Sequence, residues 1–154
     1  MDASLDTGAD RETSVEGVEA LDHTADVGIR VVADALPELY RRAALGALWM
    51  ALGVPPDPGE EVRTLEVTAG DHPDLMRRWL REVLFLQEVE GFAAGGVQPL
   101  ELIPGPSGIG LVATLRGGPA PLHPVREIKG VTWHGLQVEE RRSGEWFAQV
   151  IFDV

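Results

Sequence analysis

The sequence contains no cysteine, and this absence excludes several kinds of site. Without thiols the chain cannot form disulfides, thiolate zinc sites or a cysteine nucleophile. No stretch approaches the roughly 20 apolar residues that a membrane-spanning helix requires. The N-terminal residues also lack a basic region followed by an apolar stretch. We therefore expect a soluble cytoplasmic protein that makes no contact with a membrane.

Positive charge is scarce as well. The 154 residues carry 25 acidic and 13 basic side chains, which gives a formal net charge of −12. Such a surface repels polyanions, so direct binding of nucleic acid is disfavoured. A basic partner or a cation fits it better, although an acidic surface can also serve solubility alone. The sequence further lacks a glycine-rich phosphate loop after a strand, a G-x-S-x-G motif and an H-E-x-x-H motif.

The hydrophobic pattern predicts one α+β domain over residues 18–154. Residues 1–17 are acidic and nearly without apolar side chains, so we predict a disordered tail there. Apolar residues at helical spacing predict helices over 36–52 and 72–90, the second capped by Asp71 with Pro73 in its first turn. Residues 18–33 predict a strand pair or a bulged strand, and 62–67 a short strand. Residues 97–154 predict a meander of at least four strands.

These elements suggest a compact domain in which two helices pack on antiparallel β-sheet. We expect six to eight strands in total. The 18 glycines and 11 prolines fit this expectation, because antiparallel structure needs many tight turns. Trp49, Trp79, Trp133 and Trp146 lie on periodic apolar faces or in predicted strands, so we expect them in the core.

The segment DHTADVG, residues 22–28, holds one candidate for a functional residue. Asp26 lies two residues before Gly28, where a backbone can turn and expose a side chain. His23 and Asp26 would face opposite sides of a strand, so only a turn would bring them together. The alternative is that Asp22 or Asp26 caps a turn. We interpret His72, His123 and His134 as surface or turn residues rather than ligands.

The C-terminal segment WFAQVIFDV places two negative charges at the end of an apolar run. Asp153 and the terminal carboxylate of Val154 are hard oxygen ligands, the type that Mg²⁺, Ca²⁺ and Mn²⁺ prefer. Two such charges require a cation or a basic residue nearby. If a strand containing Asp26 pairs near the chain end, a hard-metal site becomes plausible. The alternative is a frayed terminus exposed to water.

Lysine is used once, whereas arginine is used twelve times. Lys129 is therefore unusual in a chain that uses arginine for almost every positive charge. A lysine ammonium is a compact charge on a flexible stem, which a planar guanidinium does not reproduce. This contrast indicates a specific role for Lys129.

Taken together, several segments in order over residues 19–154 resemble the archease family: DHTADVGIRV, LPELYRRAALGAL, WLREVLFLQEVEG, EIKGVTWHGLQV and WFAQVIFDV. The resemblance implies a compact α+β domain with two helices on antiparallel sheet. It also implies that Asp26, Asp153 and Val154 form a divalent-metal site. Ala35 departs from the pattern, because it stands where a capping serine or threonine would precede the first helix; its cost is about 1 kcal/mol of helix stability.

Archeases are protein cofactors of the GTP-dependent RNA ligase of tRNA splicing and RNA repair, and they promote its guanylylation and multiple turnover. The resemblance therefore implies a non-catalytic activator that meets RNA only through the ligase, with Asp26, Lys129 and Asp153 responsible for activation. Two alternatives remain open. One is a small metal-dependent hydrolase that uses Asp26, Asp153 and His23. The other is a chaperone or modulator of an RNA-modifying methyltransferase.

Overall fold

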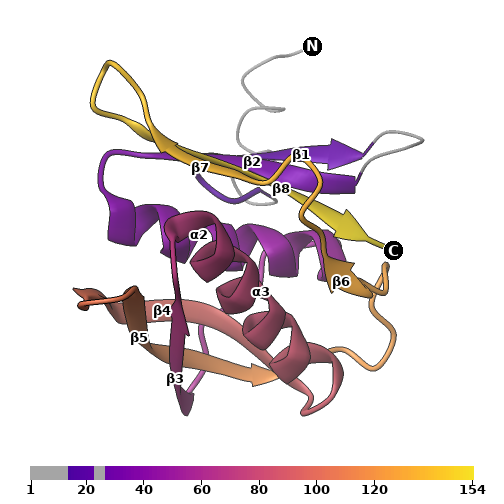
Figure 1. The fold of residues 1–154 in the computed structure, drawn as a ribbon. Helices are drawn as coiled ribbons and strands as arrows, with labels where there is room; N and C mark the ends of the chain where they lie inside the picture. The colour runs from indigo at the N-terminus through magenta and orange to yellow at the C-terminus, as the bar shows by residue number, and fades with distance from the viewer. Residues whose placement is uncertain (1–13, 23–26) are drawn as a thin grey trace.

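Two antiparallel sheets enclose the two helices in the described part of the chain (Figure 1). The computed structural model describes residues 14–22 and 27–154. In chain order the elements are β1 (Val18–Asp22), β2 (Val27–Ala33), α2 (Leu36–Leu52), β3 (Glu61–Ala69), α3 (His72–Glu88), β4 (Phe92–Pro104), β5 (Ile109–Pro119), β6 (Gly130–Val131), β7 (Gln137–Glu140) and β8 (Trp146–Asp153). The first sheet has the order β1-β2-β8-β6, with β7 also paired to β8. The second sheet has the order β3-β5-β4.

The predicted α+β class and the two predicted helices are confirmed, but the prediction of a single meander over residues 97–154 is wrong. β4 and β5 pair with β3 in one sheet, whereas β6, β7 and β8 belong to the other. An irregular segment with three prolines in residues 119–124 separates the two groups. Proline cannot donate a backbone hydrogen bond, so this segment leaves one sheet and crosses to the next.

Local sequence signals set the ends of both helices. The Asp71 side chain accepts a hydrogen bond from the Asp74 N–H at 2.9 Å, which confirms the predicted cap of α3. At the start of α2, Ala35 provides no side-chain cap, and Pro37 lies in the first turn instead. α2 ends at Leu52, and Gly53 follows as its C-cap. Gly53 has a φ of 82°, a conformation that glycine adopts without steric cost. α3 ends at Glu88, two residues before the predicted end.

The apolar faces of both helices meet between the sheets and form the core. Seven apolar residues of α3 are buried: Leu75, Met76, Trp79, Leu80, Val83, Leu84 and Leu86. The Trp79 ring is fully buried, and its Nε1–H donates to the Tyr40 carbonyl on α2 at 2.9 Å. This bond satisfies the polar atom of the indole while the rest of the ring packs against apolar neighbours.

The residues that precede β1 also contact the domain. The Val32 N–H donates to the Gly17 carbonyl at 2.9 Å, and Glu16 lies 3.5 Å from Arg42. Residues 1–13 lie outside the described residues, so the disorder predicted for residues 1–17 stays a prediction. No helix in the described part of the chain is long and apolar enough to cross a membrane.

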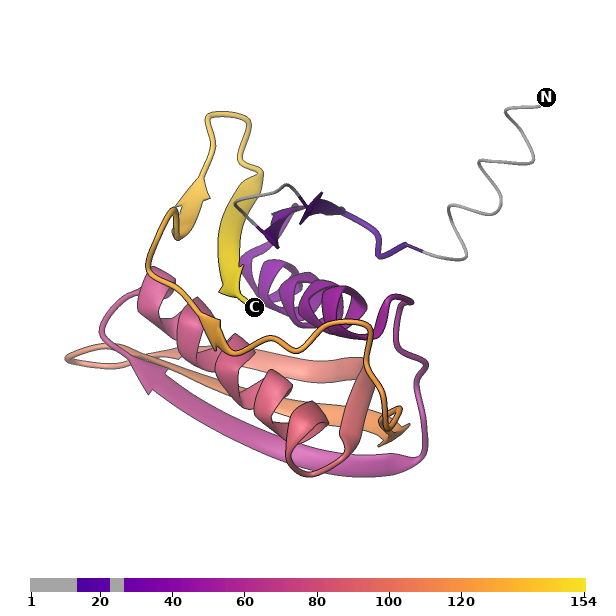
Figure 2. The same cartoon turned by 90° about the vertical axis from the view of Figure 1, so that its right-hand side faces the viewer.

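β8 is an interior strand of its sheet, which explains the apolar character of the C-terminal residues. It pairs with β2 along one edge and with β6 and β7 along the other (Figure 2). Val150 is fully buried, and Phe152 is 3% exposed. A strand with neighbours on both edges and a helix against one face buries most of its side chains. The residues of β8 up to Phe152 therefore form part of the core, and only Asp153 and Val154 are exposed.

Gly28 permits β2 and β8 to approach each other closely. It lies opposite Ile151 in the antiparallel register, and a Cβ atom at position 28 would overlap the Val150 carbonyl oxygen. Because that obstacle is backbone in the middle of a sheet, it cannot rotate away. The glycine of the DHTADVG segment is therefore required by packing, independently of any functional role.

We predict that Gly28→Ala lowers the free energy of unfolding by about 1–3 kcal/mol, because the added methyl group must push the two strands apart. Gly118→Ala is the matched control, since a Cβ there would meet nothing within 4 Å. Its effect should stay within about 0.5 kcal/mol. Urea denaturation of the three proteins measures both changes. Equal stability of the two variants would contradict the close approach of β2 and β8.

Candidate functional site

The end of β8 brings two of the predicted functional residues together. The Lys129 N–H donates to the Asp153 carbonyl oxygen at 2.6 Å, and Gly130 lies opposite Asp153 in the register between β6 and β8. The two residues are 24 positions apart in the sequence, and the short strand β6 joins them. The sequence identified Lys129 and Asp153 separately, and the structure shows that their backbones are direct neighbours.

Both side chains are exposed at this strand end. Asp153 directly follows the buried Phe152, and the Val154 residue after it is 49% exposed. Within the described part of the chain, neither the Lys129 ammonium nor the Asp153 carboxylate forms a hydrogen bond or an ion pair. Backbone pairing fixes the strand through Asp153, so the two charged groups start from an ordered base while their ends remain available.

The β1–β2 hairpin reaches the same end of the sheet. Asp22 lies opposite Val27, and Val27 lies opposite Phe152. His23 and Asp26, both named in the sequence analysis, fall in residues 23–26 and lie outside the described residues. The structure therefore describes the residues that flank Asp26, and it leaves the predicted role of Asp26 as a prediction.

Arg126 connects this hairpin to α2, and its role was not predicted from the sequence. Its guanidinium donates to the Asp22 carboxylate at 2.8 Å and to the Met50 carbonyl at 2.7 Å. Its own N–H donates to the Ala51 carbonyl at 3.2 Å. Arg126 thus fixes the segment that leads to Lys129 against the end of α2. Nothing in the sequence distinguishes it from the other arginines, because its partners come from distant parts of the chain.

The predicted metal ligands include only two groups that the structure describes, the Asp153 side chain and the Val154 carboxylate. Among residues 14–22 and 27–154, no group of three His, Asp or Glu side chains lies close enough to hold a metal ion. A site of the predicted composition would need Asp26 as its third ligand. The metal site therefore stays a prediction.

The described histidines differ in their surroundings. His123 and His134 are exposed, as predicted. His72 is not in a loop, since it is the first residue of α3, where its Nδ1 and the Tyr40 hydroxyl form a hydrogen bond of 2.8 Å. The partial burial that accompanies this contact lowers the pKa of His72 below its ordinary 6.5, and the Asp71 carboxylate opposes the shift only in part. The neutral imidazole therefore belongs to the folded state.

The tryptophans also divide into two groups. Trp79 is buried as predicted, and Trp49 and Trp146 are half-buried. The expectation of a core position is wrong for Trp133, which is 61% exposed. Trp133 follows β6 in an irregular segment, where the alternation of a strand no longer decides which side chains point inward.

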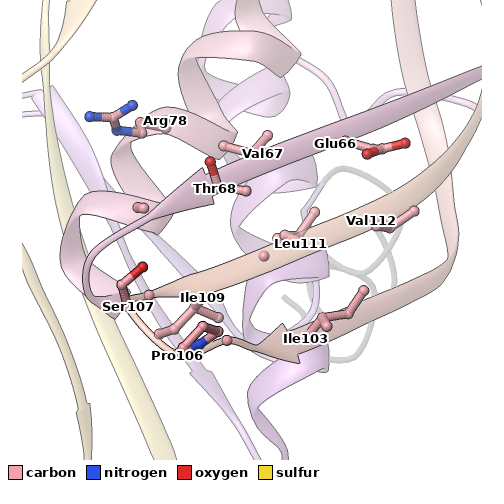
Figure 3. A pocket seen from close by; sticks show the side chains of 14 residues that line it. Glu66, Val67, Thr68, Arg78, Ile103, Pro106, Ser107, Ile109, Leu111 and Val112 are labelled. Atoms are coloured by element: carbon pink, nitrogen blue, oxygen red, sulfur yellow. The ribbon is translucent and has the colours of Figure 1, made fainter.

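A pocket of about 590 Å³ lies at the far end of the other sheet (Figure 3). Glu66 and Thr68 of β3, Arg78 of α3 and Ser107 of the β4–β5 turn contribute its polar side chains. Glu66 and Arg78 lie at opposite ends of the pocket, and the Arg78 Nε donates to Asp74 at 3.0 Å. These polar groups do not converge on one point, and the lining includes none of the residues predicted to function.

We predict that acidification below pH 6.5 destabilises the wild-type protein partly through His72. A His with a lowered folded pKa contributes stability above the unfolded pKa, and this stability is lost as the pH falls through the folded pKa. His72→Gln should therefore lose less thermal stability than wild type between pH 7.5 and pH 5.5, values chosen about one unit either side of 6.5. His123→Gln, at an exposed position, should follow the wild type. An equal loss in all three proteins would contradict the role assigned to His72.

Known protein sequences match most of the length of this chain. The model of the archease protein family matches residues 19–154. The archease of Thermococcus kodakarensis is 31% identical over 139 residues, which cover 88% of this chain and 97% of that protein. For the archease of Methanopyrus kandleri the identity is 32%, with 88% and 98% covered. The archease of Archaeoglobus fulgidus is 34% identical over 143 residues, with 87% and 96% covered.

Solved structures show the same fold. The solution structure of protein 1598 from Methanobacterium thermoautotrophicum matches with a TM-score of 0.73 and 26% identity, covering 90% of this chain and 99% of that one. The crystal structure of an archease from Thermotoga maritima, named there as a possible chaperone, matches with a TM-score of 0.54. Its identity is 18%, with 88% of this chain and 96% of that chain covered, so it supports the fold alone.

Proposed function

Because this chain belongs to the archease family, we propose that it activates the GTP-dependent RNA ligase of tRNA splicing and RNA repair. In this role it promotes guanylylation and multiple turnover of the ligase and performs no catalysis itself. The proposal rests chiefly on one observation, the direct contact between the backbones of Lys129 and Asp153 at the end of β8. These are two of the three residues that the family resemblance marks for activation.

The exposure of these residues supports action on another protein. Lys129 and Asp153 project from a strand end, and neither lines the 590 Å³ pocket on the other sheet. Because their backbone is already paired, these residues lose mainly side-chain rotamer freedom when they bind a partner, at a cost of about 0.5–1.5 kcal/mol for a long side chain such as lysine. A net charge of −12 favours a basic protein surface as that partner, and it leaves contact with RNA to the ligase.

A divalent cation fits the ligands available at this end of the sheet. The Asp153 carboxylate and the terminal carboxylate are hard oxygen donors, and no basic side chain in the described residues neutralises Asp153. Val27 lies opposite Phe152, so the residue that follows Asp26 in the chain is paired with the residue that precedes Asp153. Asp26, Asp153 and Val154 would then hold Ca²⁺, Mg²⁺ or Mn²⁺. Such a cation would offset two of the three negative charges of these carboxylates and reduce their mutual repulsion.

One assay with purified proteins tests the activating role against its alternatives. The cognate ligase, GTP, Mn²⁺ and a cleaved RNA are incubated with or without this protein, and joined product is counted per ligase molecule. We expect more joined product per ligase molecule when this protein is present. An increase in the activity of an RNA-modifying methyltransferase, with no increase in ligation, would favour the chaperone alternative. Cleavage of phosphoesters without ligase would favour a hydrolase. We retain a cytoplasmic location as part of this proposal.

We predict that Lys129→Ala reduces ligase activation by at least about tenfold while leaving thermal stability nearly unchanged, because the side chain is exposed and unpaired in the described structure. Lys129→Arg should recover only part of the activity, since a guanidinium differs from an ammonium in shape and hydration. Ligase turnover and a thermal melt measure the two effects. Full recovery with arginine would show that any positive charge suffices.

We predict that divalent cations raise the thermal midpoint of the wild-type protein, because a ligand that binds only the folded state stabilises it. Asp153→Asn and Asp26→Asn each remove one charge at nearly constant volume, so both should fold while the metal-dependent shift and ligase activation fall together. A C-terminal extension replaces the terminal carboxylate with a neutral peptide and should have the same effect.

The matched control is Asp34→Asn, at an acidic residue beyond the opposite end of β2. It should retain both the metal-dependent shift and the activation of the ligase. If Asp26→Asn and Asp153→Asn shift with metal as much as wild type does, these residues do not bind the cation. If turnover is undiminished in either variant, that residue plays no part in activation.

A further inference from the structure

Trp133 exposes 61% of its surface, although tryptophan carries one of the largest apolar surfaces of any side chain. It lies two residues after β6, in the EIKGVTWHGLQV segment that also contains Lys129. It lies between the half-buried Thr132 and the exposed His134. Contacts with β8 and α3 hold the indole in this position.

The backbone around Trp133 is anchored to β8 at both ends. The Thr132 N–H and Oγ1 both donate to the Ile151 carbonyl, each at 3.0 Å. On the other side, the Gln149 side-chain amide donates to the Gly135 carbonyl at 2.9 Å. Gly135 adopts a φ of 66°, which allows the chain to turn there without strain. Residues 132–136, which we call the Trp133 loop, are thus fixed to an interior strand of the sheet.

An arginine supports one face of the indole ring. The Arg77 guanidinium carbon lies 4.2 Å from the Trp133 ring centroid, and the Arg77 side chain is only 14% exposed. Asp74 holds the guanidinium at 3.3 Å, and Asp74 is itself 18% exposed. Arg77 Nε is buried and makes no hydrogen bond within the described structure, so the guanidinium acts mainly as a flat surface for the ring.

These contacts leave a rigid indole with one face covered and much of its surface open. A side chain of this kind loses little conformational entropy on binding, and tryptophan is enriched among the residues that dominate protein interfaces. Trp133 lies near the proposed activating residues, because only β6 and Thr132 separate it from Lys129, and β6 pairs with the strand that carries Asp153.

We propose that Trp133 is the anchor by which this protein binds the ligase, and that its open face receives an aliphatic or prolyl side chain of that enzyme. This inference rests on the proposed function and adds the residue that supplies affinity. Arg77 already occupies one face of the ring, so a second cation on the other face is disfavoured. A stacked RNA base is disfavoured by the net charge of −12. A neutral apolar group within a basic protein surface satisfies both conditions.

The anchor should be separable from the activating residues by a binding experiment. Purified ligase is immobilised, and the dissociation constants of wild type, Trp133→Ala, Trp133→Phe and Phe85→Ala are measured. Phe85 is the matched control, because it is a 48% exposed aromatic residue near the C-terminal end of α3, whereas Arg77 lies near the N-terminal end. We expect at least about tenfold weaker binding for Trp133→Ala and an intermediate value for Trp133→Phe. Phe85→Ala should bind within about twofold of wild type.

Ligase turnover against protein concentration provides the second measurement. Trp133→Ala should raise the half-saturating concentration and reach the wild-type maximum, whereas a change in the activating residues lowers the maximum. Wild-type binding by Trp133→Ala, or an equal loss in Phe85→Ala, overturns the anchor. Binding of labelled RNA without ligase, lost in Trp133→Ala, overturns it in favour of base stacking. If the wild-type protein binds the ligase through Trp133 but does not raise turnover, the anchor proposal is supported and the proposed activating function is wrong. If the wild-type protein does not bind the ligase, both proposals are wrong.

Discussion

The pairing of β2 with β8 connects the first hairpin of the chain to its last residues. Seven residue pairs join the two strands, from Val27 opposite Phe152 to Ala33 opposite Trp146. Their partners lie more than 110 positions apart in the sequence, so the loop that closes between them includes both helices and the entire second sheet. Gly28 permits the close approach, and the apolar side chains of β8 complete the core above α2. The position of the charged end of this sheet depends on that pairing.

The same pairing determines where function can lie. Because β8 is an interior strand, Phe152 is paired with both β2 and β6, and Asp153 is paired with β6. Asp153 is thereby carried to the sheet end with its carboxylate exposed, and the Lys129 backbone is bonded directly to it. The Trp133 loop is attached to the same strand through Ile151 and Gln149. One buried strand thus positions the groups that we propose for cation binding, activation and partner binding.

The sequence predicted what local patterns control. The helices were evident because apolar residues repeat at helical spacing over four turns, and the cap at Asp71 marked one start. The division of the strands between two sheets was not evident, because alternation shows that a segment is a strand without showing its partner. Lys129 was noticed for its rarity, but its contact with Asp153 depends on the pairing of β6. The roles of Arg126 and Trp133 could not be predicted from a local pattern. Arg126 binds groups that are distant in the sequence. Trp133 lies outside the strands, where alternation does not predict burial.

We propose that this end of the sheet gathers carboxylates around a divalent cation beside Lys129. Paramagnetic broadening of amide signals in a ¹⁵N-labelled sample, titrated with Mn²⁺ and referenced to Mg²⁺, locates the ion directly. We predict that the amides of Val27, Gly130, Phe152 and Val154 broaden first, while those of β3 and β5 remain sharp. First broadening among residues 1–17, or on the sheet that contains β3 and β5, would contradict the account.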